Sequence, residues 1–236
     1  MHREQICLSA DETIGASKSP RMMVNDGRSG FQMEPDGVIF YRTKRSRDIK
    51  AVVEVGISQT YASLLEKARK WIFGKKCNIV ILVAFNKRRP YERPNRRICL
   101  ATSEETRWIE QMRLNWNSQN HNEYGPLVFQ GHVWLDQLRE GFIEVVRINP
   151  SSDERDPLLK RRYVLLNEGR NESSSVTRSV GDIRMGELIP NESLNNIAAS
   201  EVIIDFFDAE GFMNIVWEAM IDTAVDRFEA ATTTCA

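Results

Sequence analysis

The sequence predicts an α/β protein whose mixed β-sheet is flanked by helices, and two observations carry this prediction. Between residues 34 and 85, apolar strand patterns stand on either side of one amphipathic helix pattern. In addition, 42% of the 236 residues are hydrophobic, which is enough for a substantial core and argues against global disorder. We therefore expect one α/β core domain that is followed by an extension.

The first predicted elements are two strands. Residues 1–20 are polar and poorly periodic, and Gly15 interrupts any helix there. The sequence predicts a strand at residues 21–24 and a second strand at residues 36–41, which Pro35 opens.

A third strand is predicted at residues 51–57. Valine and isoleucine side chains occupy both of its faces, a pattern typical of a central strand that is covered on both sides. Glu54 interrupts this apolar run. A buried carboxylate is costly unless it gains a hydrogen bond, a counter-charge or a metal ion, so Glu54 is the first candidate for a functional residue.

An amphipathic helix is predicted at residues 61–73. Leu64 and Trp71 share one face of it, which we expect to pack on the sheet, and Lys67 flanks that face. The strand that follows, at residues 78–85, is almost wholly apolar and is therefore expected to be central.

The later part of the chain shows weaker patterns. We predict a core domain at residues 21–166 and an acidic extension at residues 167–236 that ends in a helix. Residues 127–133 and 142–148 are expected to add strands to the main sheet. The other predicted elements are strands at 98–101 and 163–166 and helices at 106–114 and 212–228.

Charge is strongly segregated along the chain. Residues 42–97 carry 16 Lys and Arg residues against four acidic ones, a local net charge of +12, although the whole chain has a net charge of −1. Residues 181–236 carry eleven acidic residues against two arginines. A basic block of this density is typical of a surface that binds polyanions. An alternative is that the basic block and the acidic end neutralise each other within one fold.

The cysteine pattern and the hydropathy exclude several classes of protein. The four cysteines are scattered without metal-ligand spacing, as in an intracellular protein with reduced thiols. No apolar run reaches the ~18 residues that a membrane-spanning helix needs, and the first residues lack the apolar region of a secretory signal. We therefore expect an intracellular protein, in the nucleus or the cytoplasm.

The order of motifs between residues 34 and 85 resembles that of the PD-(D/E)XK nuclease superfamily. The resemblance rests on Pro35 and Asp36, on Glu54 within VVEVGISQ, and on the helix that carries Lys67 and Trp71, followed by the strand NIVILVAF. Within the superfamily it looks like a restriction-endonuclease-like family expanded in fungal genomes. The resemblance covers residues 30–90 well and residues 140–190 weakly.

This resemblance implies a phosphodiesterase centre. It implies that Asp36, Glu54 and the backbone carbonyl of Val55 bind Mg²⁺ or Mn²⁺, which acts as a Lewis acid and lowers the pKa of a bound water. The superfamily places a lysine two residues after the second acid, but here that position is Gly56. Lys67 on the following helix, or Gln59, would then assist the water.

Two alternatives stand beside the nuclease interpretation. Glu54 could be a structural acid that pairs with Lys67 or Lys50, and the protein could be an inactive nucleic-acid-binding or interaction module on the same fold. In both functional interpretations, two basic loops at residues 42–50 and 87–97 would bind the phosphate backbone of DNA or RNA. The residues that we expect to make these contacts are Arg42, Lys44, Arg45, Arg47, Lys87, Arg88 and Arg89.

Overall fold

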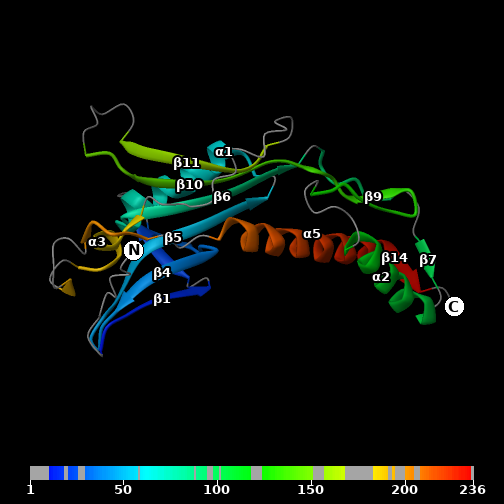
Figure 1. Cartoon of the computed structure of the whole chain (residues 1–236), viewed down its shortest axis with the longest axis horizontal. Coiled ribbons are helices and arrows are strands. Elements are labelled where there is room, and N and C mark those ends of the chain that lie inside the picture. The colour runs from blue at the N-terminus through cyan, green and yellow to red at the C-terminus, as the bar shows by residue number, and fades with distance from the viewer. Residues whose placement is uncertain are drawn as a thin grey trace, which may run out of the picture. The chain divides into compact units, whose positions relative to one another are not determined.

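The chain divides into two compact units. Unit 1 comprises residues 1–84, 142–164 and 179–207, and unit 2 comprises residues 85–141, 165–178 and 208–236. The structure is a computed structural model, shown in Figure 1. It describes residues 11–18, 21–25, 30–57, 59–87, 89–94, 98–100, 102–117, 124–150, 157–167, 183–190, 193–194, 200–204 and 208–234.

The main sheet confirms the predicted α/β class, because it is mixed, mostly antiparallel and flanked by helices. Among the described residues it has six strands in the order β1-β4-β5-β6-β10-β11. Their bounds are β1 Thr13–Lys18, β4 Gly37–Arg42, β5 Arg47–Ile57, β6 Ile79–Lys87, β10 Leu138–Ile148 and β11 Leu158–Asn167.

Strands β4 and β5 confirm the two predicted strands, and the structure shows that they pair as an antiparallel hairpin. The turn between them is closed by Thr43, whose Oγ1 accepts hydrogen bonds from the backbone N–H groups of Arg45 and Ser46. Because this turn is so short, β5 begins at Arg47 rather than at the predicted residue 51. β5 lies between β4 and β6, so its predicted central position is confirmed. Val52 and Glu54 on one face are buried, but Val55 and Ile57 on the other face are exposed, so the expectation that both faces are covered is wrong for this end of the strand.

Helix α1 (Tyr61–Arg69) continues into the π-helical turn η1 (Lys70–Gly74). Thr60 caps its start by accepting a hydrogen bond from the Ser63 N–H at 3.2 Å. Leu64 and Trp71 are fully buried and belong to the same core cluster as Val52 and Val80. The predicted packing of the helix on the sheet is therefore confirmed.

Strand β1 was not predicted, because its sequence is polar and contains Gly15. It pairs antiparallel with β4, so it forms one edge of the main sheet. The Phe40 ring covers Gly15 so closely that a Cβ at this position would lie 2.7 Å from Phe40 Cζ. The glycine that argued against a helix therefore admits an aromatic side chain from the neighbouring strand.

The remaining elements of unit 1 lie on this sheet or beside it. Strands β2 (Met22–Asn25) and β3 (Gly30–Met33) form a hairpin that supplies Met22 and Val24 to the core. β12 (Ile183–Arg184) pairs with β13 (Ile203–Ile204), and the short helix α3 (Met185–Leu188) directly follows β12. Arg147 on β10 holds α3 through two hydrogen bonds to Glu187, at 2.6 and 3.0 Å.

Unit 2 is built around the long helix α5 (Ala209–Ala231), which confirms and extends the predicted C-terminal helix. Trp134 and Phe228 pack edge to face in its core, with ring centroids 5.2 Å apart. The other elements of this unit are β7 (Ile98–Leu100), α2 (Thr102–Asn117), β8 (Leu127–Phe129), β9 (His132–Leu135) and β14 (Thr232–Thr234), which pairs with β7.

The expectation that residues 127–133 add one strand to the main sheet is wrong. They form the hairpin β8–β9, which is a separate two-stranded sheet. The backbone turns at Gln130 and Gly131, whose φ angles are +52° and +70°. Two consecutive positive φ angles are the mark of the tight turns that join hairpin strands. The predicted strand at residues 142–148 does lie in the main sheet, within β10.

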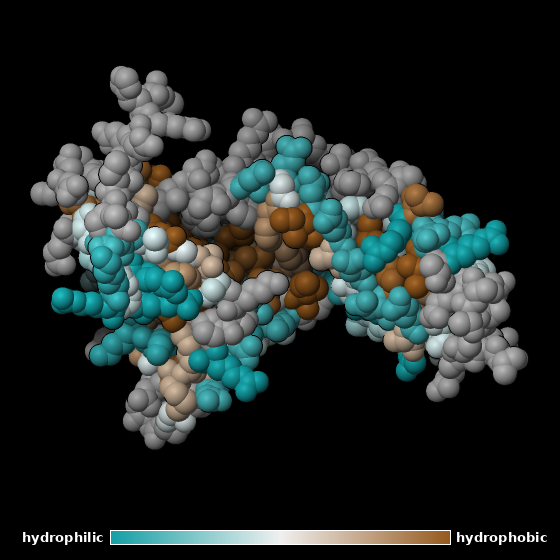
Figure 2. Space-filling model, turned by 90° about the horizontal axis from the view of Figure 1, so that it is seen from below, coloured by the Kyte–Doolittle hydropathy of each residue, from teal (hydrophilic) through white to brown (hydrophobic). Residues whose placement is uncertain are grey.

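The surface of the protein carries hydrophobic as well as hydrophilic residues, as one face in Figure 2 shows. The exposed large apolar side chains of unit 1 include Met23, Ile57 and Phe73. Within the described residues, no helix is long and apolar enough to cross a membrane.

Candidate functional site

Glu54 lies in the core of unit 1 with only 1% of its surface exposed. Its Oε2 accepts a hydrogen bond from Lys67 Nζ at 2.9 Å, and its Oε1 accepts one from Trp71 Nε1 at 2.6 Å. Both carboxylate oxygens therefore have a donor, one of them charged. This is how the protein tolerates an acid inside an apolar strand.

The two donors to Glu54, Lys67 and Trp71, both come from the helical segment that follows β5. Lys67 and Trp71 are four residues apart, so their side chains lie over the same face of the helix. Trp71 lies in the π-helical turn η1, a type of turn that is frequent at functional sites. The Lys67 side chain is 34% exposed, so its ammonium group faces Glu54 on one side and solvent on the other.

Asp36 lies directly before β4, at the end of the β4–β5 ladder. Gly37, the first residue of β4, is opposite Val53, and Asp36 lies in the bend directly before it. The Oδ2 of Asp36 accepts the Val55 N–H at 2.7 Å. The structure thus brings together four of the predicted residues: Asp36, Glu54, Val55 and Lys67.

Gln59 is exposed and lies between β5 and α1. Within the described part of the chain, its side chain makes no hydrogen bond to Asp36, Glu54 or Lys67. Lys67 is therefore the predicted assisting residue that contacts one of the two acids.

Packing explains why no lysine stands two residues after Glu54. Gly56 is buried on β5, and a Cβ there would lie 2.7 Å from Leu64 Cδ1 and 3.0 Å from Leu64 Cδ2. A side chain at this position would therefore have to displace Leu64, a fully buried residue of helix α1. The same helix carries Lys67, which occupies the space beside Glu54.

The ligand atoms available at this site are oxygens, which is the type of ligand that Mg²⁺ prefers. Two carboxylates and one backbone carbonyl are oxygen ligands, and Mg²⁺ is commonly held by one or two carboxylates with water and substrate phosphates completing its shell. Among the described residues, no group of three or more His, Cys, Asp or Glu side chains could hold a metal ion. The protein would thus supply the ion with two carboxylates, Asp36 and Glu54, and the carbonyl of Val55.

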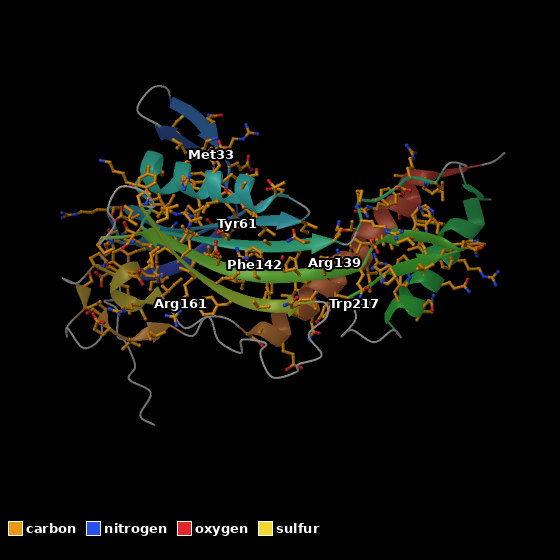
Figure 3. All side chains as sticks on the ribbon, turned by 90° about the horizontal axis from the view of Figure 1, so that it is seen from above. Met33, Tyr61, Arg139, Phe142, Arg161 and Trp217 are labelled. Atoms are coloured by element: carbon orange, nitrogen blue, oxygen red, sulfur yellow. The ribbon has the colours of Figure 1, made fainter. Side chains whose placement is uncertain are left out.

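A second buried acid beneath α1 was not predicted. Glu144 on β10 is 3% exposed. Its Oε2 accepts a hydrogen bond from the Tyr61 hydroxyl at 2.6 Å, and its Oε1 accepts one from Arg162 Nε at 2.9 Å. The Arg162 guanidinium lies over the Phe142 ring, 3.8 Å from its centroid. Figure 3 shows Tyr61 and Phe142 side by side, with ring centroids 6.1 Å apart.

The sequence did contain a signal for Glu144. It is a lone acid inside the apolar run FIEVV, just as Glu54 is inside VVEV. The same argument about the cost of a buried carboxylate applies to both positions. Burial, followed by the hydrogen bond to Glu144, raises the pKa of Tyr61 to about 12.

The basic turn between β4 and β5 is remote from these acids. Six residues of β4 at about 3.3 Å each place the turn about 20 Å from Asp36 along the strand. The side chains of this turn contact other groups there. Lys44 pairs with Asp11 at 2.6 Å, Arg47 donates to Ser17 Oγ at 2.6 Å, and the guanidinium groups of Arg42 and Arg47 lie over the Phe40 ring. Arg45 is exposed.

The other predicted basic residues belong to unit 2. Lys87 ends β6 and is half-buried, whereas Arg89 is exposed, and Arg88 lies outside the described residues. In unit 1, Glu12 bonds to Tyr41 and Ser193. Because Tyr41 lies near the turn end of β4, Glu12 lies at that end of the strand and not beside Asp36.

Comparisons of the chain with protein-family models, with curated proteins and with solved structures found no match.

Proposed function

We propose that unit 1 is a PD-(D/E)XK-like, Mg²⁺-dependent nuclease, or a protein derived from one, that acts on phosphodiester bonds of DNA or RNA. One observation carries the proposal. Asp36 is bonded to the backbone of Val55, the residue after Glu54, and Glu54 in turn bonds to Lys67. One acid directly before β4, one acid on β5 and a lysine in contact with the second are groups of the kind that metal-assisted hydrolysis of a phosphodiester uses.

Asp36, Glu54 and the carbonyl of Val55 would hold Mg²⁺ or Mn²⁺, and the ion would supply Lewis acidity and a water of lowered pKa. Asp36 is oriented for this role, because its Oδ2 is anchored on the Val55 N–H. Glu54 is held in place by Trp71, whose indole N–H keeps it aligned on the strand.

Lys67 has the geometry of an assisting cation. An ammonium group has three donors, and one of them is used on Glu54. Because its side chain is about one-third exposed, the remaining donors can reach a phosphate oxygen or a water molecule. A cation at this point stabilises negative charge that develops on the phosphate during hydrolysis.

A second candidate function is an inactive module that binds nucleic acid. The observation that favours it is that both oxygens of Glu54 already have protein donors and that Glu54 is almost completely buried. An acid so well neutralised is suited to hold α1 on the sheet without any metal. Such a module would bind nucleic acid in a strongly salt-dependent way and without turnover.

Calorimetric titration with Mg²⁺ and Mn²⁺ separates the two candidates. The proposal expects metal binding by the wild-type chain and its loss in Asp36→Asn and Glu54→Gln. Glu34→Gln is the matched control, because Glu34 is an exposed acid two residues before Asp36 that pairs with Arg21.

The same variants are then incubated with single- and double-stranded DNA and RNA oligonucleotides in the presence of either metal. Cleavage by wild type and Glu34→Gln, but not by the two site variants, supports the nuclease. Metal binding that is unchanged in both site variants overturns the assignment of these acids. A folded wild type that binds no metal favours the inactive module instead.

A further inference from the structure

Unit 2 contains a pocket that the proposed metal centre does not use. Its volume is about 390 Å³, and it lies between the segment at residues 89–92 and the hairpin β8–β9. The side chains that define its chemistry are Arg89, Tyr91, Glu92, His132 and Asp136. A volume of this size lies in the range of small-molecule sites and is much larger than a single phosphate ion needs.

Two aromatic rings in the pocket lining are held in place by their neighbours. The rings of Tyr91 and His132 meet edge to face with centroids 6.2 Å apart, and His132 packs against Trp134 at 4.7 Å. His132 Nε2 lies 3.1 Å from the backbone oxygen of Glu92, which fixes the imidazole orientation. The pocket therefore offers ordered aromatic surface.

A cation packs against this aromatic wall, and a second cation is close enough to repel it. The Arg227 guanidinium lies over Tyr91, 4.2 Å from the ring centroid, and donates to the Trp134 carbonyl at 2.8 Å. Lys87 is half-buried, and burial, followed by repulsion from Arg227, lowers its pKa. Among the described residues, neither Lys87 nor Arg227 forms an ion pair with an acid. An anionic ligand beside them would relieve this repulsion.

One acid in the pocket, Asp136, is placed to accept a hydrogen bond from a ligand. Asp136 Oδ1 accepts the N–H of Gln137 at 2.8 Å, which orients the carboxylate and leaves Oδ2 for a ligand. A carboxylate accepts hydrogen bonds from the exocyclic amino group of a base such as cytosine, whereas uracil presents a carbonyl oxygen at the same place.

We propose that this pocket binds a nucleoside monophosphate unit, supplied either as a free nucleotide or as one nucleotide of a single strand. Arg89, the cation that lines the pocket, holds the phosphate, and the positive charges of Arg227 and Lys87 favour an anion nearby. The base lies against the aromatic wall of Tyr91 and His132, where stacking tolerates any base. Asp136 adds a preference for an amino-bearing base such as cytosine over uracil.

The test is calorimetric titration of the full chain with CMP, UMP, inorganic phosphate and a short oligocytidine. EDTA is present throughout, so that Asp36 and Glu54 cannot contribute through a metal ion and failure of the metal centre leaves this result unaffected. We expect CMP to bind about tenfold more tightly than UMP, and inorganic phosphate to bind more weakly than either.

Three variants locate the binding. Arg89→Gln is expected to weaken CMP binding about tenfold, and Asp136→Asn to remove the preference for CMP over UMP. Arg107→Gln is the matched control, because Arg107 is an exposed arginine of unit 2 outside the pocket. Circular dichroism checks that each variant is folded.

CMP affinity no higher than that of phosphate, or equal affinity in all variants, overturns the proposal. Oligocytidine that binds more tightly than CMP identifies a single strand as the source of the nucleotide, and equal affinity identifies the free nucleotide.

Discussion

Gly56 on β5 lies against Leu64 of α1 so closely that a Cβ would stand 2.7 Å from Leu64 Cδ1. This contact sets the distance between the helix and the strand that carries Glu54. A side chain at position 56 would have to displace Leu64, on the helix that also carries Lys67.

Gly56→Ala should destabilise the fold. Leu64 is fully buried, so it can move only by disturbing the core around it, and overpacking of this kind costs about 1–3 kcal/mol. Gly37→Ala is the matched control on the neighbouring strand, because a Cβ there would make an ordinary contact of 3.5 Å with Val53 Cβ. Urea denaturation measures both. Equal stability of the two variants would show that the contact does not limit the packing of α1.

Lys67→Met should also destabilise the protein, because it leaves the charge of Glu54 buried without its counter-charge. Breaking a buried ion pair costs about 3–5 kcal/mol, and the partial exposure of Lys67 reduces this to about 2 kcal/mol. Lys70→Met is the control, because Lys70 forms an exposed pair with Glu66 on the same helix and should cost less than about 0.5 kcal/mol.

Glu54→Gln should restore much of the stability that Lys67→Met removes. The amide oxygen of glutamine still accepts the hydrogen bond from Trp71, but the uncompensated charge is gone. A double-mutant cycle measured by urea denaturation gives the coupling free energy. Strictly additive effects would mean that the two side chains do not interact in solution.

The part of the site that the sequence predicted is the part that depends on local pattern. The apolar run around Glu54 predicted a buried acid, and the spacing of Leu64 and Trp71 predicted which helix face covers it. Lys67 lies between these two positions, so both the functional and the structural interpretation could name it as a partner. Strand and helix periodicity thus gave the frame of the site.

The unpredicted parts depend on contacts that periodicity does not encode. Trp71 was expected to be an ordinary core residue, but from the π-helical turn it donates a hydrogen bond to Glu54. Arg162 meets Glu144 because their strands, β11 and β10, are neighbours in the main sheet. Strand β1 was missed because its polar sequence pairs at an edge of the sheet, where little apolar burial is needed.

Cys77 should be unreactive in the folded protein. Its side chain is buried, and burial raises the pKa of the thiol from 9.0 to about 11, which leaves about a hundredfold less thiolate, the nucleophilic form, at neutral pH. The measurement is alkylation in a variant whose other three cysteines are replaced by serine. Labelling should be slow in buffer and rapid in urea. Equal rates in both would show that the thiol is accessible.

Tyr61 should make stability fall at high pH. Burial and the hydrogen bond to Glu144 raise its pKa from 10.0 to about 12, so the folded protein holds the phenolic proton more tightly than the unfolded chain does. This stabilisation is fully present below pH 10 and is lost as the pH rises from about 10 to about 12. We expect the urea midpoint of the wild type to fall in this window more steeply than that of Tyr61→Phe, which has no proton to lose at this position. Parallel curves for the two proteins would contradict a raised pKa. The tyrosinate absorbance difference between them should titrate near pH 12, and a difference centred at pH 10 would place the Tyr61 hydroxyl in solvent rather than on Glu144.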